Sequence, residues 1–113
     1  MIRVEITRKY NHYSTVKVTG HAFAGEPGKD LVCAAVSTLA QTLANSVEEI
    51  GHIPEESIEL SIDSGYFELR LQNEDLNDIV DIIFGTFRVG IEGIERTYSK
   101  YIKLIIKEVQ GKC

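Results

Sequence analysis

The sequence is poor in the residues that define several special classes of protein. It has no tryptophan, two prolines and two cysteines among 113 residues, so a proline-rich chain and a disulfide-dense scaffold do not fit. We expect a reducing cytosol, and the position of Cys113 as the last residue, to keep it from pairing with Cys33. Both cysteines are therefore predicted to be free thiols.

Long apolar runs are missing too. No stretch approaches the roughly 20 residues that cross a membrane, and residues 1–5 lack the apolar segment of a signal peptide. We therefore expect a cytoplasmic protein with no membrane partner. Basic residues are in the minority, since 12 Lys and Arg face 17 Asp and Glu for a net charge of −5. This balance disfavours direct binding to nucleic acid and permits a basic protein partner.

Residues that commonly bind metals are sparse. Three histidines and two cysteines stand at positions 12, 21, 33, 52 and 113, and these spacings match no metal-ligand pattern. We therefore predict no metal site and no cofactor. His12 falls in a predicted hairpin turn and His52 just beyond a predicted helix, and neither is assigned a role.

The remaining composition is that of an ordinary folded domain. A 43% apolar fraction over this length suffices for one core, so residues 1–113 are predicted to form a single domain. Apolar residues alternate with polar ones in several segments, which is typical of strands with one buried face. Such segments lie at residues 2–6, 15–19, 58–62, 67–71 and about 101–109. Residues 8–12 and 63–65 are expected to close two hairpins.

A first helix is expected from an N-cap at Asp30 to Ile50, with Gly51 ending it in the left-handed conformation. Its apolar positions recur every three or four residues, which predicts one core-facing stripe. That stripe holds Val32, Val36, Leu39, Leu43, Val47 and Ile50. Beside it, the small side chains of Ala34, Ala40 and Ala44 are expected to leave room for another chain.

A second helix is expected to be capped by Asn73, with Glu74 and Asp75 in its first turn. Its predicted stripe holds Leu76, Ile79, Val80, Ile83 and Phe87. The element order is then ββαββαβ. This order predicts an α+β fold, in which a mainly antiparallel five-stranded sheet has both helices packed on one face.

The segment from Gly20 to Leu39 is typical of thiol chemistry, because a histidine leaves a strand and a cysteine opens a helix. With Asp30 as N-cap, Cys33 falls in the first turn, where the helix dipole favours a thiolate. Asp30, Cys33 and Ser37 lie within about 60° of one another around the helix, on a flank that borders the core. The alternative is that Cys33 is simply a small packed hydrophobe.

Two blocks in this segment carry a resemblance to a known family. They are Gly20-His21-Ala22 and Asp30-Leu31-Val32-Cys33-Ala34-Ala35-Val36-Ser37. Together with the chain length and the element order, they resemble the ribosomal-processing cysteine proteases of bacteria (Prp). The resemblance implies that His21 and Cys33 are the catalytic pair, supported by Asp30 and Ser37. It also implies a mobile substrate loop that contains Phe23, Gly25 and Gly28.

The same resemblance implies a function. Members of that family remove a short N-terminal extension from a large-subunit ribosomal protein, cut after an aromatic residue, and are homodimers. The expected partners are therefore the N-terminal segment of a basic ribosomal protein, which suits an acidic enzyme, and a second copy of the chain. The alternative is a non-catalytic, ribosome-associated module that binds such a peptide without cutting it.

The implied mechanism gives each residue an expected part. His21 would take the proton from Cys33 and return it to the leaving amine, while backbone amides at the helix start would meet the oxyanion. Asp30 would orient His21 or only cap the helix. Ser37 would bond to His21, to the substrate or to a carbonyl of its own helix. Candidate walls for an aromatic pocket are Phe23, Tyr66 and Phe67.

Overall fold

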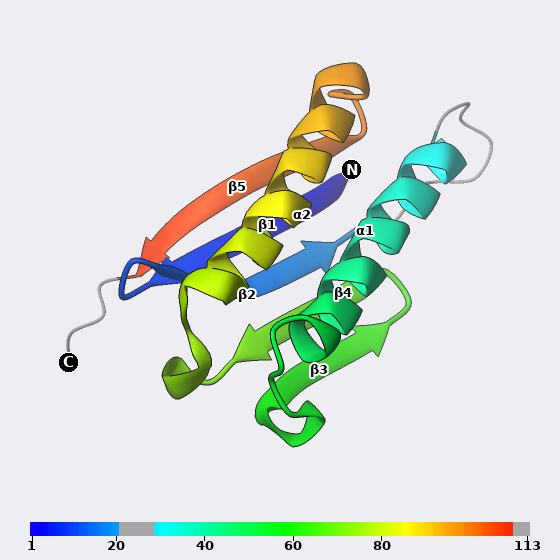
Figure 1. Cartoon of the computed structure of the whole chain (residues 1–113). Coiled ribbons are helices and arrows are strands. Elements are labelled where there is room, and N and C mark those ends of the chain that lie inside the picture. Colours follow the sequence, from blue (N-terminus) through cyan, green and yellow to red (C-terminus); the bar gives the residue numbers. More distant parts are fainter. Residues whose placement is uncertain (21–28, 110–113) are drawn as a thin grey trace.

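The protein folds as two layers, a sheet and a pair of helices (Figure 1). The structure, a computed structural model, describes residues 1–20 and 29–109. Five strands form the sheet: β1 (Ile2–Lys9), β2 (His12–Thr19), β3 (Ile58–Asp63), β4 (Tyr66–Leu71) and β5 (Ile102–Val109). All five occur where the sequence alternates, so their positions are confirmed, but β1 and β2 extend into the connection expected at residues 8–12, and His12 belongs to β2 and not to a turn.

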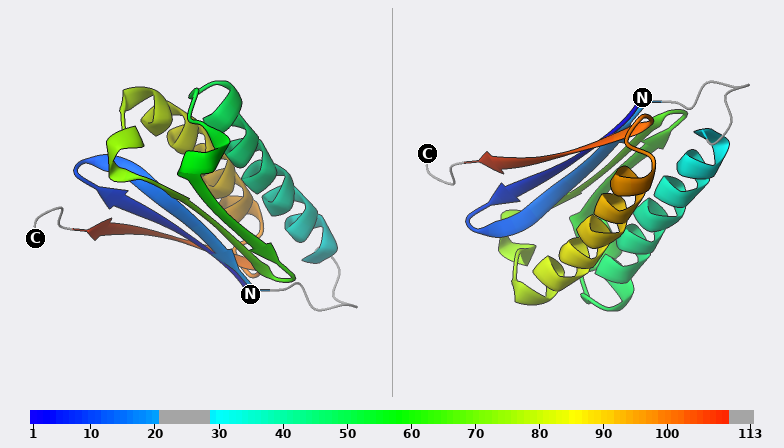
Figure 2. Two further views of the ribbon diagram at one scale, coloured as in Figure 1. Left: turned by 90° about the horizontal axis from the view of Figure 1, so that it is seen from below. Right: turned by 90° about the horizontal axis from the view of Figure 1, so that it is seen from above.

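The two helices, α1 (Lys29–Glu49) and α2 (Asp78–Thr97), lie side by side on the same face of the sheet (Figure 2). Two short 3₁₀ helices, η1 (Glu55–Ser57) and η2 (Asn73–Asp75), precede β3 and α2. Within the described residues, neither α1 nor α2 is long and apolar enough to span a membrane. The predicted fold class, with both helices on one face, is confirmed.

The strand order across the sheet is β3-β4-β2-β1-β5. β1 pairs antiparallel with β2, as do β2 with β4 and β3 with β4, whereas β5 runs parallel to β1. The chain must cross the sheet to bring β5 beside β1, and α2 makes that crossing on the helical face (Figure 1). The sheet is therefore mainly antiparallel, with one parallel pair at its edge.

The core lies between the helices and one face of the sheet. Every second strand residue points into it, because successive side chains of a strand point to opposite faces. The register sets Val4 beside Val18 and Val16 beside Leu69, so apolar side chains meet across three strands. The buried apolar strand residues are Ile2, Val4, Ile6, Val16, Phe67, Leu69, Leu71 and Ile102. This single covered face explains why alternation located the strands.

The opposite face of the sheet carries charged side chains. Lys107 Nζ lies 2.9 Å from Glu5 Oε1, and Arg70 Nη2 lies 2.9 Å from Glu68 Oε2. The hydrogen bond from Lys107 lowers the pKa of Glu5, and the hydrogen bond from Arg70 lowers the pKa of Glu68. Both carboxylates therefore stabilise the fold above the ordinary glutamate pKa, and this contribution is lost as the pH falls through their lowered values.

The C-terminal end of α1 differs from the prediction. The helix stops at Glu49, and Ile50, expected on the core stripe, is 60% exposed. The left-handed residue is His52, with φ 57°, and not Gly51. A Cβ on Gly51 would lie 2.6 Å from the carbonyl oxygen of Val47, so glycine is needed here for close packing. The prediction was wrong because the sequence does not distinguish these two uses of glycine.

The face that α1 buries is wider than predicted. Ala40, expected on a flank open to another chain, is 3% exposed and belongs to the core. Ala44 also packs against the core, and Leu39 is partly buried beside it. The predicted positions that are fully buried are Val32, Val36, Leu43 and Val47. Two of the three alanines therefore pack against the core of this chain, while Ala34 is exposed.

The second helix begins later than predicted. Asn77, and not Asn73, is the N-cap, because its side-chain oxygen accepts a hydrogen bond from the N–H of Val80 at 2.9 Å. Asn73 instead opens η2, and Leu76 then runs in extended backbone before the cap. The shift turns Ile79 outward, to 54% exposure. The buried stripe of α2 is Val80, Phe84, Phe87 and Ile91.

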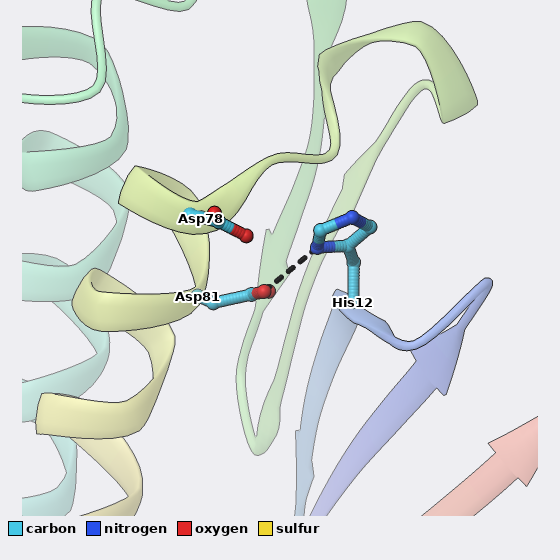
Figure 3. A group of neighbouring side chains, drawn as sticks. All are labelled: His12, Asp78 and Asp81. Carbon is cyan, nitrogen blue, oxygen red and sulfur yellow. Dashed lines mark hydrogen bonds and ion pairs between the residues drawn. The ribbon is translucent and has the colours of Figure 1, made fainter.

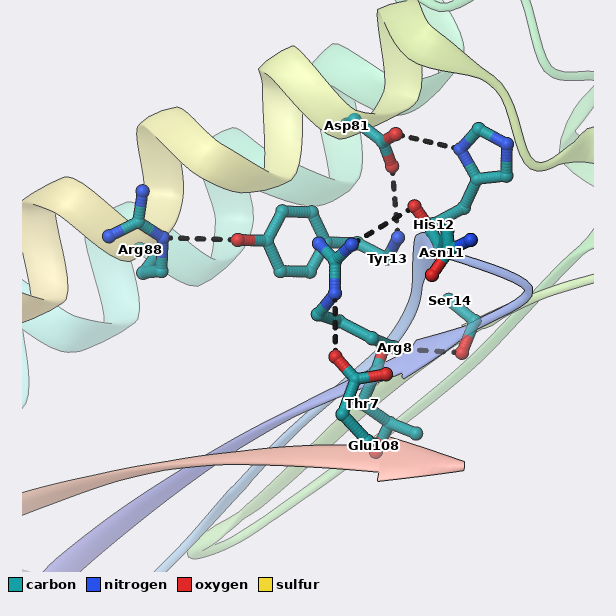
Figure 4. Close-up of polar contacts among 9 residues, drawn as sticks. All are labelled: Thr7, Arg8, Asn11, His12, Tyr13, Ser14, Asp81, Arg88 and Glu108. Carbon is teal, nitrogen blue, oxygen red and sulfur yellow. Dashed lines mark hydrogen bonds and ion pairs between the residues drawn. The ribbon is translucent and has the colours of Figure 1, made fainter. Parts of the chain in front are cut away.

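Polar and aromatic contacts join α2 to the β1–β2 hairpin (Figure 4). Asp81 accepts a hydrogen bond from the backbone N–H of Tyr13 at 2.9 Å, and its other oxygen lies 2.7 Å from His12 Nδ1. Arg88 Nε donates to the Tyr13 hydroxyl at 3.1 Å. The Tyr13 ring stacks on Phe84 with centroids 5.9 Å apart. These contacts fix the first half of α2 against the hairpin.

Replacing Phe84 by alanine is expected to lower the free energy of unfolding by about 3–5 kcal/mol. Its side chain is fully buried, so the change leaves a cavity and removes the stack on Tyr13. Val109→Ala is the control, because Val109 is 44% exposed and its loss is expected to cost less than about 0.5 kcal/mol. Urea unfolding followed by circular dichroism measures both, and equal losses would contradict the described core.

Candidate active site

A largely apolar cavity opens between α1 and the β3–β4 hairpin. Its volume is about 240 Å³. Cys33, Ser37 and Gln41 of α1 form one wall. The facing walls come from the sheet, and include Val18, Ile62, Tyr66 and Phe67. Four segments that are distant in the sequence therefore meet around the cysteine.

Cys33 lies at the border of the core, as the sequence predicts. Val32 and Val36 on the same helix are buried, and they hold the helical face that carries Cys33 against the sheet. Cys33 itself is a free cysteine of intermediate burial that packs against the core on one side and lines the cavity on the other. Its sulfur is therefore a cavity-lining group and not a filler of the interior.

Ser37 is exposed and lines the same cavity one helical turn after Cys33. Its Oγ accepts a hydrogen bond from Gln41 Nε2 at 3.1 Å. Within the described residues, the Ser37 hydroxyl makes no hydrogen bond to a carbonyl of its own helix, in contrast to Thr38, which donates to Ala34 O at 2.9 Å. Among the described residues, the Ser37 hydroxyl therefore has no backbone carbonyl as acceptor.

The start of α1 differs from the prediction by one residue. The helix begins at Lys29, so Asp30 lies within it and not at the N-cap, and Cys33 is the fifth helical residue. The side chain of Asp30 is outside the described part of the structure. Because only the first N–H groups of a helix lack an intrahelical partner, free amides belong to the residues before Cys33. The helix dipole acts on Cys33 from one turn away.

His21, Phe23, Gly25 and Gly28 lie outside the described residues. The chain enters this segment from Gly20, which lines the cavity, and leaves it at Lys29, one turn before Cys33. Both ends of the segment are thus beside the cavity. The structure brings together Cys33 and Ser37 of the predicted site, while His21 and the loop residues remain predictions.

Gly20 is held in a conformation that only glycine adopts easily. Its φ is 104°, its N–H donates to Gly65 O at 3.1 Å, and a Cβ would lie 2.2 Å from the carbonyl oxygen of Met1. The end of β2 is thereby packed between the start of β1 and the β3–β4 turn. This packing sets where the chain leaves the sheet toward residue 21.

Some residues of the site were not found from the sequence. Ile62 alternates as a buried strand residue does, yet it lines the cavity and is 64% exposed, because β3 is an edge strand and the helices do not cover this end of it. Alternation indicates which face a residue occupies but not whether a helix covers that point. Tyr66 and Phe67, which were candidate walls, do line the cavity.

Tyr66 is tied to the charged side of the sheet. Its hydroxyl donates to Glu68 Oε1 at 2.9 Å, and this bond raises the pKa of Tyr66, so the phenol stays protonated. The ammonium group of Lys17 lies 5.9 Å from the centre of the ring. The ring therefore has a fixed position at the edge of the cavity.

Comparisons with known proteins point to one protease family. The model of the family described as cysteine protease Prp matches residues 1–103. Ribosomal processing cysteine protease Prp of Staphylococcus aureus (strain Mu50) is 34% identical over 110 residues, covering 95% of this chain and 100% of that protein. A crystal structure of the S. aureus protease Prp with a substrate peptide aligns with a TM-score of 0.79 at 32% identity, covering 95% of this chain and 100% of that chain. A second one, with a covalently linked product peptide, aligns with a TM-score of 0.76 at 33% identity and the same coverage.

These matches define the class of the protein as a cysteine protease, and hence a hydrolase. They extend over nearly the whole chain and over both layers of the fold. The chain belongs to the cysteine protease Prp family.

Gly20→Ala is expected to destabilise the protein by about 1–3 kcal/mol, because a Cβ would meet backbone atoms and a positive φ disfavours alanine. Gly85→Ala is the matched control. Gly85 lies within α2, and a Cβ there meets nothing within 4 Å, so the change is expected to stabilise the helix by up to about 1 kcal/mol. Thermal unfolding measures whether each variant is less or more stable than the wild type. A Gly20→Ala variant as stable as the wild type would contradict the close approach of Gly20 to the Met1 carbonyl.

Proposed function

We propose that this protease removes the N-terminal extension of a large-subunit ribosomal protein, cutting after an aromatic residue with Cys33 as nucleophile and His21 as base. The observation that carries the proposal is the placement of Cys33 on the wall of an apolar cavity, with both ends of the segment that contains His21 beside it. The S. aureus relatives are ribosomal processing proteases, one of them in complex with a substrate peptide.

The chemistry begins with proton transfer from Cys33 Sγ to His21. The thiolate attacks the scissile carbonyl carbon, and free amides at the start of α1 stabilise the resulting oxyanion. His21 then returns the proton to the leaving amine, and an acyl-enzyme remains on Cys33 until water hydrolyses it. The covalently linked product peptide in the S. aureus structure supports such an intermediate.

Two further residues support the pair. Ser37 lines the same cavity, and its hydroxyl is suited to donate a hydrogen bond to His21 or to the substrate. Asp30, inside the first turn of α1, would orient His21, since the helical bounds remove the N-cap role first expected of it. Phe23, Gly25 and Gly28 belong to the loop that would close over a bound peptide.

The cavity suits an aromatic side chain. Val18, Ile62 and Phe67 provide apolar walls, and the exposed side chain of Ile62 would be covered by the bound peptide. The net charge of −5 favours the approach of a basic ribosomal protein. We place the reaction in the cytoplasm, where newly made ribosomal proteins are found.

Cys33→Ala is expected to lower cleavage of a synthetic peptide spanning the ribosomal extension by at least about 10³-fold, because the nucleophile is lost. His21→Ala is expected to lower it by at least about 10²-fold. Cys113→Ala is the matched control and is expected to retain full activity. Product formation is measured by mass spectrometry.

Two outcomes of that experiment would contradict the proposal. Unchanged cleavage by Cys33→Ala would exclude the cysteine as the nucleophile. Binding of the peptide without cleavage by the wild-type chain would favour the alternative of a non-catalytic ribosome-associated module. A peptide with alanine in place of the aromatic residue tests the specificity separately, and equal cleavage of both peptides would contradict an aromatic subsite.

We also propose a homodimer, as the family resemblance implies. In support, Ile50 just after α1 and Ile79, Ile82 and Val89 on α2 are each more than half exposed, which is a large amount of apolar surface for one small domain. Light scattering coupled to size-exclusion chromatography is expected to give twice the chain mass of 12.6 kDa. A mass of one chain at micromolar concentration would contradict the dimer and leave the proposed protease chemistry untouched.

A further inference from the structure

Three side chains with metal-binding atoms meet at the end of the molecule opposite the cavity (Figure 3). His12 stands at the start of β2, while Cys33 and the cavity lie near the other end of that strand. Asp78 and Asp81 come from the first turn of α2. One ligand atom from each of the three residues lies within 4.8 Å of the other two. The set combines an imidazole nitrogen and two carboxylate oxygens, drawn from two elements 66 residues or more apart in the sequence.

Two of the three groups are held in place. Asp81 Oδ2 lies 2.7 Å from His12 Nδ1, and Asp81 Oδ1 accepts the backbone N–H of Tyr13 at 2.9 Å. His12 and Asp81 side chains are 28% and 25% exposed, so both are half-buried. The stack of Tyr13 on Phe84 fixes the same corner from the core. A ligand therefore meets two preorganised donors, which lowers the cost of binding.

The third group is free to move. Asp78 is exposed, and its carboxylate makes no hydrogen bond or ion pair within the part of the chain that is described. Figure 3 shows it on the turn above Asp81, with its carboxylate toward His12. Two ligands of one zinc ion lie about 3.3 Å apart in tetrahedral geometry, by its usual bond lengths. A rotamer change of this exposed side chain closes the remaining gap.

The local charge favours a cation. Within the described residues, no lysine or arginine forms an ion pair with Asp78 or Asp81. Arg8 pairs with Glu108 at 2.9 Å and lies over the ring of Tyr13, and Lys9, the cross-strand partner of His12, lies over the ring of Tyr10. The N-terminal end of α2 opposes a cation with about half a unit charge, which is less than two carboxylates supply. Because the negative charge of the two carboxylates exceeds the partial positive charge of the helix end, we expect moderate affinity for a cation.

We propose that His12, Asp78 and Asp81 bind a divalent cation of the zinc class and thereby clamp the β1–β2 hairpin to α2. Imidazole with carboxylates suits zinc and its neighbours in the transition series better than calcium or magnesium, which prefer oxygen ligands alone. Metal binding replaces the hydrogen bond between His12 Nδ1 and Asp81, so these atoms, now 2.7 Å apart, move to the roughly 3.3 Å that two ligands of one ion require, and the proton of that bond leaves to solvent. Three protein ligands leave a position for water. The spacing of histidines and cysteines along the sequence does not reveal this site. Two of its three ligands are aspartates that approach His12 only in the folded chain.

The experiment titrates zinc chloride into the full-length chain by calorimetry, after alkylation of Cys33 and Cys113 so that thiols do not bind the metal. We expect one ion per chain with micromolar affinity, and a rise of several degrees in the unfolding temperature with zinc in excess. His12→Asn and Asp78→Asn are each expected to weaken binding at least tenfold. On adding zinc, the ¹⁵N resonance of His12 Nδ1 is expected to shift.

His52→Asn is the matched control, because His52 is an exposed histidine whose φ of 57° asparagine also adopts. It is expected to bind zinc as the wild type does. Asp78→Asn removes no hydrogen bond among the described residues, so it also separates loss of the metal from loss of folding. No binding at 1 mM zinc, or affinity unchanged in both His12→Asn and Asp78→Asn, would overturn the proposal. Neither result bears on peptide cleavage.

Discussion

The packing of α1 on the sheet is the constraint on which the site depends. Val32 and Val36 are buried in the core, and this fixes the rotation of the helix about its axis. Once that rotation is fixed, Cys33 must lie at the border between core and cavity, and Ser37 must follow it one turn later. Cys33 thus owes its position to the apolar side chains beside it.

The opposite wall of the cavity depends on the edges of the sheet. β3 is an edge strand that the helices leave uncovered, so Ile62 remains exposed there. Gly20 packs against the backbone of Met1 and bonds to Gly65, and this joins the ends of three strands next to the cysteine. The cavity therefore arises where the helical layer is narrower than the sheet. At the far end of β2, Asp81 joins the hairpin to α2 and creates a second group of polar side chains.

Prediction from the sequence succeeded where one physical signal dominated. Strands were found because each one buries a single face, and the family blocks around His21 and Cys33 were found because they are contiguous in the sequence. Helix ends were predicted poorly. Asn73 and Asn77 are both good N-caps, and only the packing of Leu76 and Val80 selects between them. Gly51 was misjudged because close approach and positive φ both select glycine.

The sequence by itself determined the two-layer class, the positions of the strands and the cysteine that borders the core, because these follow from local periodicity. Tertiary structure alone decided that Ala40 is core, that Ile62 is exposed beside Cys33, and that His12 meets Asp78 and Asp81. Each of these depends on which distant segments become neighbours. That choice is made by the crossing of α2 and by the strand order of the sheet, which periodicity along one segment does not encode.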